Sequence, residues 1–248
     1  MKKLAFLLLM VLLLSCLLIT GTGAGSPDQY SLTHEEIHIL LTMGFSQEGI
    51  YQLDYPEAAA ALELYDQTGG KARLISHDQG DFYPASSPGV TVRMFYGDHW
   101  VSGSLRYFQI CSQASIGRKP KTAAIGTVWE HGWNIQSVQA RYSYFNLFGN
   151  YQSRNMSTLL NQVSYLGVAH SHNSWPSYIS AAVISQEIIL YMPVNFSQPT
   201  WFFARAVDSV DSGVSFSASF STAPLGVTFS PFWQIYAQGT ASNYYIPN

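Results

Sequence analysis

The second half of the chain contains almost no charged side chains. Of the 12 Lys and Arg and the 15 Asp and Glu residues, only five follow Arg141: Arg154, Glu187, Arg205, Asp208 and Asp211. Residues 214–221 instead alternate apolar side chains with serine, as Val-Ser-Phe-Ser-Ala-Ser-Phe-Ser. Successive side chains of a strand point to opposite faces, so this period of two predicts a strand with one apolar face and one hydroxyl-covered face.

The polar side chains on the solvent-exposed face of such a strand are unusual. A soluble sheet normally presents Lys and Glu to water, whereas these strands present Ser, Thr, Asn and Gln. A neutral face of this kind suits a recognition surface, an oligomer interface or strands that enter a membrane. The pattern therefore predicts architecture and leaves the biochemical activity open.

Two turn signals predict hairpins. Gly97-Asp98-His99 separates residues 90–96 from 100–110, and Glu130-His131-Gly132 separates residues 122–129 from 133–145. Each spacing is that of a hairpin with a three-residue loop. Residues 180–192 fit both a helix and a strand, and their β-branched content favours a strand. Further strands are expected at residues 159–169, 201–207, 214–221 and 227–237, the last with a break at Pro231.

No helical crossover separates these strands, so we expect them to pair antiparallel. Eight or nine such strands are most readily buried as two packed sheets. We therefore predict a mainly β fold, an antiparallel β-sandwich of about eight or nine strands preceded by a small α-helical segment. The 47% hydrophobic content supplies enough apolar side chains for a large core.

Capping residues predict the helical segment. Thr33 and Glu36 form a Thr-x-x-Glu capping box, and Gly44 is placed to end the first helix. Ser46 is a suitable N-cap for a second short helix, and Pro56 is a suitable first-turn residue for a third. These signals predict three short helices before the strands begin.

The segment Met43-Gly44-Phe45-Ser46 resembles the loop of ubiquitin-associated three-helix domains. A helix followed by a glycine cap and a hydrophobic residue is also ordinary helix termination. We expect residues 25–70 to form a short linker and a helical prefix with a structural role.

The first 24 residues predict an export signal. Lys2 and Lys3 precede an almost wholly apolar run over residues 4–19, and residues 22–24, Thr-Gly-Ala, fit a small-x-small cleavage site. A lipoprotein is the alternative, because residues 13–16, Leu-Leu-Ser-Cys, resemble the bacterial lipobox, in which Cys16 would be lipidated. An uncleaved anchor is a third option, although the run is shorter than the about 20 residues that span a bilayer. We expect a secreted or cell-surface protein.

The predicted domains are a signal peptide at residues 1–24, a linker and helical prefix at 25–70, and a β-sandwich at 71–248. Cleavage after Ala24 removes two lysines, so the formal charge of −3 becomes −3 − 2 = −5. We expect no nucleic-acid partner for a chain of negative charge. Cys111 would then be the only cysteine, and we expect it to be a small buried apolar residue.

Residues 129–133 are the candidate ligand-binding group: Trp129, Glu130, His131 and Trp133 around Gly132. In a hairpin the two indoles would flank the loop and pair across the strands. Two indoles beside a carboxylate and an imidazole suit stacking on a sugar ring with hydrogen bonds to its hydroxyl groups. The alternative is a tryptophan pair that only stabilises the hairpin.

His170 and His172 are the candidate metal ligands, because positions i and i+2 of a strand face the same side. Two ligands are too few for zinc, which takes three or four, so the alternative is a strand end that enters a turn. No motif predicts a cofactor. The chain lacks a Gly-x-Ser-x-Gly elbow, a His-Glu-x-x-His helix and a phosphate loop, and we lean against an enzyme.

Three functions fit these observations. The one we favour is an exported, non-catalytic binding module for a glycan, an envelope polymer or a protein. The second is a pore-forming or membrane-active protein with an insertion hairpin at residues 214–237, against which Pro231 and the short first strand count. The third is a self-associating structural or matrix protein that pairs through neutral edge strands.

Overall fold

A computed structural model describes residues 31–75, 89–130, 132–156, 166–196 and 198–245. The chain divides into two compact units, residues 1–34 and 35–248, and the description that follows concerns the second. The predicted signal peptide and Cys16 lie outside the described residues, and the domain limits stay a prediction. The structure is mainly β, with 52% strand against 16% helix, and its sheets are antiparallel, as predicted.

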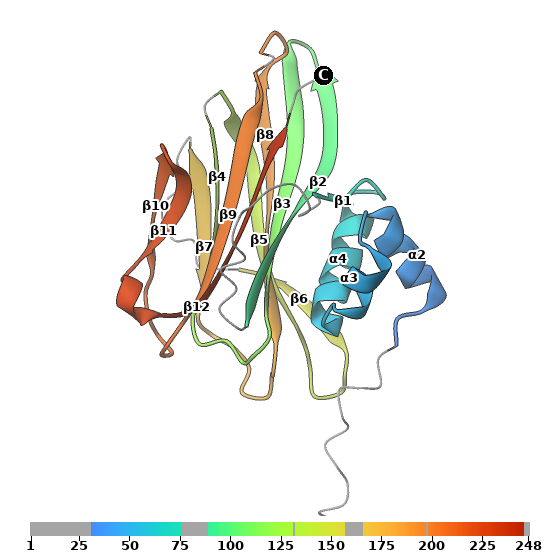
Figure 1. Cartoon of the computed structure of the whole chain (residues 1–248), viewed down its shortest axis with the longest axis vertical. Helices are drawn as coiled ribbons and strands as arrows, with labels where there is room; N and C mark the ends of the chain where they lie inside the picture. The colour runs from blue at the N-terminus through green and yellow to red at the C-terminus, as the bar shows by residue number, and fades with distance from the viewer. Residues whose placement is uncertain (1–30, 76–88, 131, 157–165, 197, 246–248) are drawn as a thin grey trace, which may run out of the picture. The chain divides into compact units, whose positions relative to one another are not determined.

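The twelve strands of the described residues form two large sheets and one hairpin (Figure 1). The six-stranded sheet has the order β1 (Arg73–Leu74), β2 (Val90–Ser102), β3 (Leu105–Ile116), β8 (Ala182–Pro193), β5 (Asn134–Phe145) and β6 (Tyr151–Asn155). The four-stranded sheet has the order β12 (Ile235–Tyr245), β9 (Thr200–Ser209), β4 (Ala123–Trp129) and β7 (Gly167–His172). Strands β10 (Ser217–Thr222) and β11 (Leu225–Ser230) pair only with each other.

Apolar side chains from both large sheets fill the space between them. Phe108 and Leu190 of the six-stranded sheet and Trp129 and Phe202 of the four-stranded sheet belong to one core cluster and are at most 2% exposed. The rings of Phe108 and Phe202 lie 5.6 Å apart across the interface. The two sheets therefore share one core, as expected of a sandwich. The strand at residues 182–193 settles the helix-or-strand ambiguity of residues 180–192 in favour of a strand.

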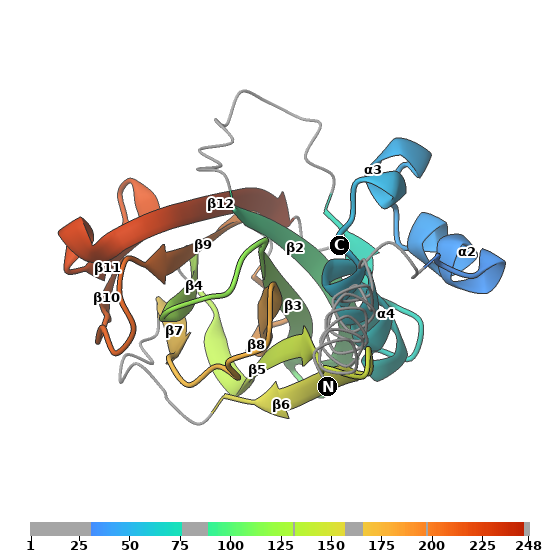
Figure 2. The same cartoon turned by 90° about the horizontal axis from the view of Figure 1, so that it is seen from below.

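The predicted helices are present. Helix α2 (His34–Thr42) ends before Gly44, whose φ of 100° is the left-handed conformation of a helix-ending glycine. Ser46 caps α3 (Gln47–Tyr51) by accepting a hydrogen bond from the Gly49 backbone nitrogen (3.0 Å). Helix α4 (Tyr55–Gln67) begins with Pro56 in its first turn and covers the outer face of the six-stranded sheet (Figure 2). No helix in the described ranges is long and apolar enough to cross a membrane.

The Met43–Gly44–Phe45 loop, which resembles that of ubiquitin-associated domains, is buried. Met43 is 0% exposed and Phe45 5% exposed, and the Phe45 ring lies 6.1 Å from that of Phe95 in β2. Its apolar side chains therefore attach the helical prefix to the sandwich, which is the structural role expected of it.

The β10–β11 hairpin covers the outer face of the four-stranded sheet (Figure 2). The alternation predicted for residues 214–221 is confirmed: Val214, Phe216 and Ala218 are buried, while the serines between them are exposed. The apolar face packs on Ala124, Val128, Ala169 and Val207. Each strand of the hairpin has six residues, fewer than the 9–11 of a membrane-spanning strand. Pro231 ends β11, as predicted.

Two turn predictions were wrong. Residues 97–98 form a bulge within β2, and the β2–β3 turn lies at Gly103, whose φ is 60°. Strands β4 and β5 do not pair as a hairpin, because β4 belongs to the four-stranded sheet and β5 to the six-stranded sheet. Gly132 has the predicted positive φ, but the segment is a crossover between the sheets. A glycine marks a change of direction and does not specify which strand comes next.

Gly126 of β4 has no room for a side chain under the hairpin. A Cβ atom there would lie 2.7 Å from Val227 Cγ1 and 3.2 Å from Phe229 Cζ. We expect Gly126→Val to lower the free energy of unfolding by about 1–3 kcal/mol, because the hairpin must shift to avoid overpacking. Urea denaturation followed by circular dichroism measures this change.

The matched control is Gly226→Ala in β11, where an added Cβ meets nothing within 4 Å. We expect its stability to equal that of the wild type or exceed it slightly. Equal stability of the Gly126→Val variant and the wild type would contradict the tight contact between the hairpin and β4.

Candidate functional site

The predicted tryptophan pair lies in the core. Trp129 is 0% exposed and Trp133 2% exposed. The Trp133 indole nitrogen donates to Thr200 Oγ1 (2.9 Å), and its ring lies 5.7 Å from that of Phe108. A sugar can stack only on an exposed ring face, so burial withdraws both indoles from the predicted ligand-binding role.

Of the other two members of that group, only Glu130 lies within the described residues. Glu130 accepts a hydrogen bond from the Trp201 backbone nitrogen through Oε2 (3.0 Å) and joins the end of β4 to the start of β9. His131 lies outside the described residues. The structure thus assigns Glu130 a bracing contact between neighbouring strands.

His170 and His172 point into the space between the sheets, on the same face of β7, as the spacing predicts. The His172 ring stacks on Tyr142 at 3.8 Å, and its Nε2 lies 2.9 Å from the Ser174 carbonyl oxygen. His170 Nδ1 lies 2.6 Å from the side-chain nitrogen of Gln186 in β8. Each imidazole therefore has a protein partner, and no three His, Cys, Asp or Glu residues of the described ranges could hold a metal ion together.

A chain of buried polar side chains connects the two sheets through Gln186. Its amide nitrogen donates to the Ile125 carbonyl oxygen (3.2 Å), and its Oε1 accepts from Thr127 Oγ1 (2.7 Å). Thr127 Oγ1 lies 2.7 Å from Ser112 Oγ. With His170, these side chains are 0–3% exposed. Because these side chains are buried, a ligand cannot reach them. Their hydrogen bonds instead fix the position of one sheet relative to the other.

Burial lowers the pKa of His170 to about 4, and it also lowers that of His172, against a raising effect of the hydrogen bond to Ser174. The Gln186 amide donates to His170 Nδ1, so the neutral ring carries its proton on Nε2. Both imidazoles are therefore neutral at pH 7, and their role is structural.

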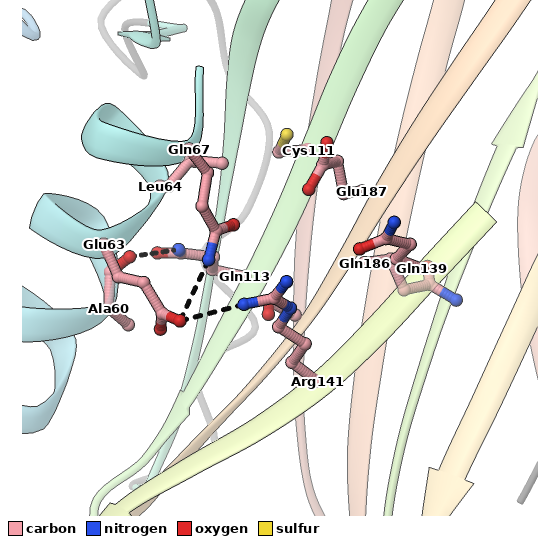
Figure 3. Close-up of a pocket in the computed structure, with 11 residues that line it drawn as sticks. Ala60, Glu63, Leu64, Gln67, Cys111, Gln113, Gln139, Arg141, Gln186 and Glu187 are labelled. Carbon is pink, nitrogen blue, oxygen red and sulfur yellow. Dashed lines mark hydrogen bonds and ion pairs between the residues drawn. The ribbon is translucent and has the colours of Figure 1, made fainter. Parts of the chain in front are cut away.

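A small cavity of about 20 Å³ lies between α4 and the outer face of the six-stranded sheet (Figure 3). Glu63 and Gln67 of α4 face Gln113 of β3 and Arg141 of β5 there, with Glu63 Oε1 3.0 Å from Arg141 Nη1. Glu63 Oε2 also accepts from the Tyr151 hydroxyl (2.8 Å), and Gln113 donates to the Ala60 carbonyl oxygen (3.0 Å). A volume of this size holds one water molecule and excludes larger ligands.

This interface is held by charge as well as by packing. Glu57 of α4 forms an ion pair with Arg93 of β2, both largely buried. Burial lowers the pKa of Arg93 to about 10, against the raising effect of Asp54, so the guanidinium stays charged at neutral pH. Burial and the neighbouring Glu187 raise the pKa of Cys111 beneath the helix, so its thiol stays protonated. Cys111 is 1% exposed.

The outer face of the β10–β11 hairpin is an open polar surface. Ser217 pairs with Ser230, and Ser219 with Thr228, in register across the two strands. Six hydroxyl side chains are exposed on the face or next to it: Ser215, Ser217, Ser219, Ser221, Thr228 and Ser230. We call this set the hydroxyl face. No charged residue occurs from residue 212 to the end of the chain.

Sequence reasoning placed both strands of this face in one hairpin at residues 214–237, but interpreted that hairpin as a membrane-insertion element. It did not identify the ladder of hydroxyl groups that faces solvent across β10 and β11. The ligand was instead expected at Trp129 and Trp133, because the sequence position of an aromatic ring near a turn does not show whether the ring is buried in the core or exposed to solvent.

No protein-family model matches the chain, and no curated protein matches it. Among solved structures, one reported as manganese lipoxygenase of Gaeumannomyces graminis with a partial zonadhesin of Komagataella pastoris is 12% identical, with a TM-score of 0.28 over 64% of this chain. The match spans 61% of that chain.

Two bacterial structures are similar at the same low level. One comes from a report on pH-induced modulation of Streptococcus parasanguinis adhesion by Fap1 fimbriae, with 10% identity, a TM-score of 0.24 and coverage of 66% of this chain and 92% of the other. The second is the KRT10-binding region domain of the pneumococcal serine rich repeat protein PsrP, with 7% identity, a TM-score of 0.27 and coverage of 62% and 98%. TM-scores this low carry no argument about function.

The buried His170 makes the fold sensitive to acid. Its folded pKa of about 4 lies below the unfolded value of 6.5, so below pH 6.5 the unfolded chain binds a proton that the folded protein does not. The stability is unaffected by His170 above pH 6.5 and falls as the pH drops toward 4. By pH 4.5 we expect a loss of roughly 2–3 kcal/mol from this residue.

Urea denaturation at pH 7.5 and pH 4.5 measures this loss. His170→Gln keeps an amide partner for Gln186 but does not titrate, so we expect it to lose less stability between the two pH values than the wild type. The same loss in both proteins would contradict a buried, neutral His170.

The ion pairs of α4 protect the Cys111 thiol. Glu63→Ala leaves Arg141 and Tyr151 without their carboxylate, which weakens the helix contact by about 1–2 kcal/mol. Because labelling of a buried thiol requires local opening, we expect Ellman's reagent to react with Cys111 about 5- to 30-fold faster. Asp66→Ala, at an exposed position of the same helix, is the matched control and should label like the wild type. Equal rates for both variants would contradict the role of Glu63.

Proposed function

We propose that the protein is an exported, non-catalytic binding module whose hydroxyl face recognises a neutral, hydroxyl-rich ligand, namely a glycan or an uncharged envelope polymer. The observation that carries the proposal is the two-sided β10–β11 hairpin, apolar toward the four-stranded sheet and hydroxyl-covered toward solvent. The export signal predicted at residues 1–24 supports a secreted or cell-surface location for this module.

The chemistry of the hydroxyl face supports a neutral ligand over an ionic one. A hydroxyl group both donates and accepts, so a row of hydroxyls complements the hydroxyls of a sugar chain. An ionic ligand is better bound by opposite charge, and residues 212–248 contain none. Arg205, which lies close by, is engaged with the Val227 carbonyl oxygen (3.2 Å) and with the Gln238 side chain.

The rigidity of the face also supports recognition. The buried rings of Phe216 and Phe229 lie 6.1 Å apart beneath the hairpin and anchor it to the sheet. Short serine and threonine side chains lose little conformational freedom on binding. A rigid scaffold with short polar side chains therefore reduces the entropy cost that otherwise weakens glycan binding.

The test removes hydroxyls and keeps the strands. Ser217→Ala, Ser219→Ala and Thr228→Val together delete three exposed hydroxyls of the ladder. Each hydrogen bond contributes about 0.5–1.5 kcal/mol, so we expect the loss of three to lower the affinity for a bound glycan about 10- to 2,000-fold. A glycan array identifies the ligand, and titration calorimetry measures the affinity.

The matched control is Thr91→Val, Ser102→Ala and Ser137→Ala, which deletes three exposed hydroxyls of the six-stranded sheet. It should bind like the wild type. Failure of the wild-type protein to bind any neutral glycan at millimolar concentration would overturn the proposal. Analytical ultracentrifugation of the same sample separates ligand binding from self-association through the same face.

A further inference from the structure

One end of the sandwich collects five of the loops that connect its strands. Strands β3, β5, β7 and β9 end there, and β4, β6, β8 and β12 begin there, as the pairing of Ala123 with both His172 and Asp208 shows for the four-stranded sheet. The β2–β3 turn lies at the opposite, upper end in Figure 1. We call residues 117–122, 146–150, 173–181, 210–216 and 231–234 the loop end.

Large apolar side chains project from four of these five loops. Leu147 and Phe148 are 73% and 85% exposed, and Phe232 and Trp233 are 65% and 81% exposed. Tyr178 and Val210 are 41% and 45% exposed. Exposing such side chains to water is unfavourable, and their concentration at one end of a fold marks an interaction surface.

These side chains are held outward by rigid local structure. Asn146 closes the turn that carries Leu147 and Phe148, because its Oδ1 accepts from the backbone nitrogens of Phe148 and Asn150, both at 3.0 Å. Phe232 and Trp233 lie on the short helix η2 (Phe232–Gln234), directly before β12. Both pairs are therefore carried by ordered backbone elements at this end of the fold.

The loop end is more basic than the rest of the chain. Its five loops contain three basic residues, Arg118, Lys119 and Lys121, and one acidic residue, Asp211, whereas the whole chain has a formal charge of −3. Asp54, beside Gly117, and Asp208, the ion-pair partner of Arg118, offset most of this surplus, so the basic character of the loop end rests on Lys119 and Lys121. Arg118 forms an ion pair with the buried Asp208 (2.5 Å), and Lys119 donates to the Ser177 carbonyl oxygen (3.0 Å).

We propose that the loop end docks on the surface of a phospholipid bilayer, with Leu147, Phe148, Phe232 and Trp233 inserted among the headgroups. Three observations favour lipid over a protein partner. The apolar side chains stand on separate loops from both sheets, which suits a broad, deformable surface. Aromatic rings prefer the interface between headgroups and acyl chains, and nearby lysines are attracted to anionic headgroups.

The proposal does not depend on the hydroxyl face, and it differs from pore formation. Interfacial binding needs apolar side chains to enter only about 5–10 Å, which loop tips can reach while the sandwich stays folded. The bilayer should therefore stay intact, and dye trapped in the vesicles should not be released.

The experiment is sedimentation of the protein with vesicles, using the chain from residue 25 onward. Vesicles of phosphatidylcholine are compared with vesicles that also contain phosphatidylglycerol. We expect the protein to bind both, more tightly to the anionic vesicles at low salt. The variant Leu147→Ser, Phe148→Ser, Phe232→Ser, Trp233→Ser should bind at least about tenfold more weakly to both, because four insertion side chains are lost.

The control variant is Val101→Ser with Trp201→Ser, which removes exposed apolar side chains from the opposite end. It should bind vesicles like the wild type, and circular dichroism should show all three proteins folded. Absence of vesicle binding by the wild type, or equal binding by the four-site variant, would overturn the proposal. Loss of self-association instead of vesicle binding in that variant would assign the loop end to a second copy of the chain.

Discussion

The buried carboxamide of Gln186 is the interaction on which the arrangement of the two sheets depends. An apolar core alone permits one sheet to slide over the other, because dispersion contacts have little directionality. Gln186 is reached by groups from β4 and β7, and each of its hydrogen bonds requires a particular register of the opposing strands. A shift by one residue would leave buried polar atoms unsatisfied, which costs far more than a change in apolar contacts. His170 belongs to this constraint, which explains why two histidines placed like metal ligands serve as structural groups.

With the sheets fixed, the distribution of charge follows from what covers each outer face. The six-stranded sheet is covered by a helix, and long side chains such as Glu57 and Arg93 can pair across that gap. The four-stranded sheet is covered by a hairpin at such close range that Gly126 and Gly167 have no room for a side chain. Charged side chains would be desolvated there, so the contact is apolar. The solvent side of the same hairpin carries short hydroxyls. The absence of charge after residue 211 therefore coincides with the hairpin and with β12 of the four-stranded sheet.

The local parts of this fold could be predicted from the sequence, and the long-range parts could not. Helix caps at Gly44 and Ser46 and the alternation of residues 214–221 depend on neighbours within a few residues, so their signals lie in the sequence itself. The step from β4 to β5 depends on which sheet buries each strand, and a positive φ at Gly132 is compatible with a hairpin as well as with a crossover. For the same reason, Trp129 and Trp133 were predicted to lie at the surface, although they are buried. The sequence does not mark Leu147–Phe148 and Phe232–Trp233 as exposed, because apolar residues are also the residues expected in a core.

The hydroxyl face and the loop end are different sides of the sandwich, because one is the broad side of a strand layer and the other is where strands end. A sandwich that rests on a bilayer through its strand ends holds its strands upright and its broad sides free. The hydroxyl face would then stay clear of the bilayer and accessible to its proposed ligand. Phe232 and Trp233 lie at the boundary, directly after Ser230 and Pro231, and Ser215 belongs to both surfaces. The rings of Phe232 and Trp233 therefore adjoin both surfaces. A bound polymer chain that extends to the end of β11 would contact these rings, and its binding would then be coupled to lipid docking.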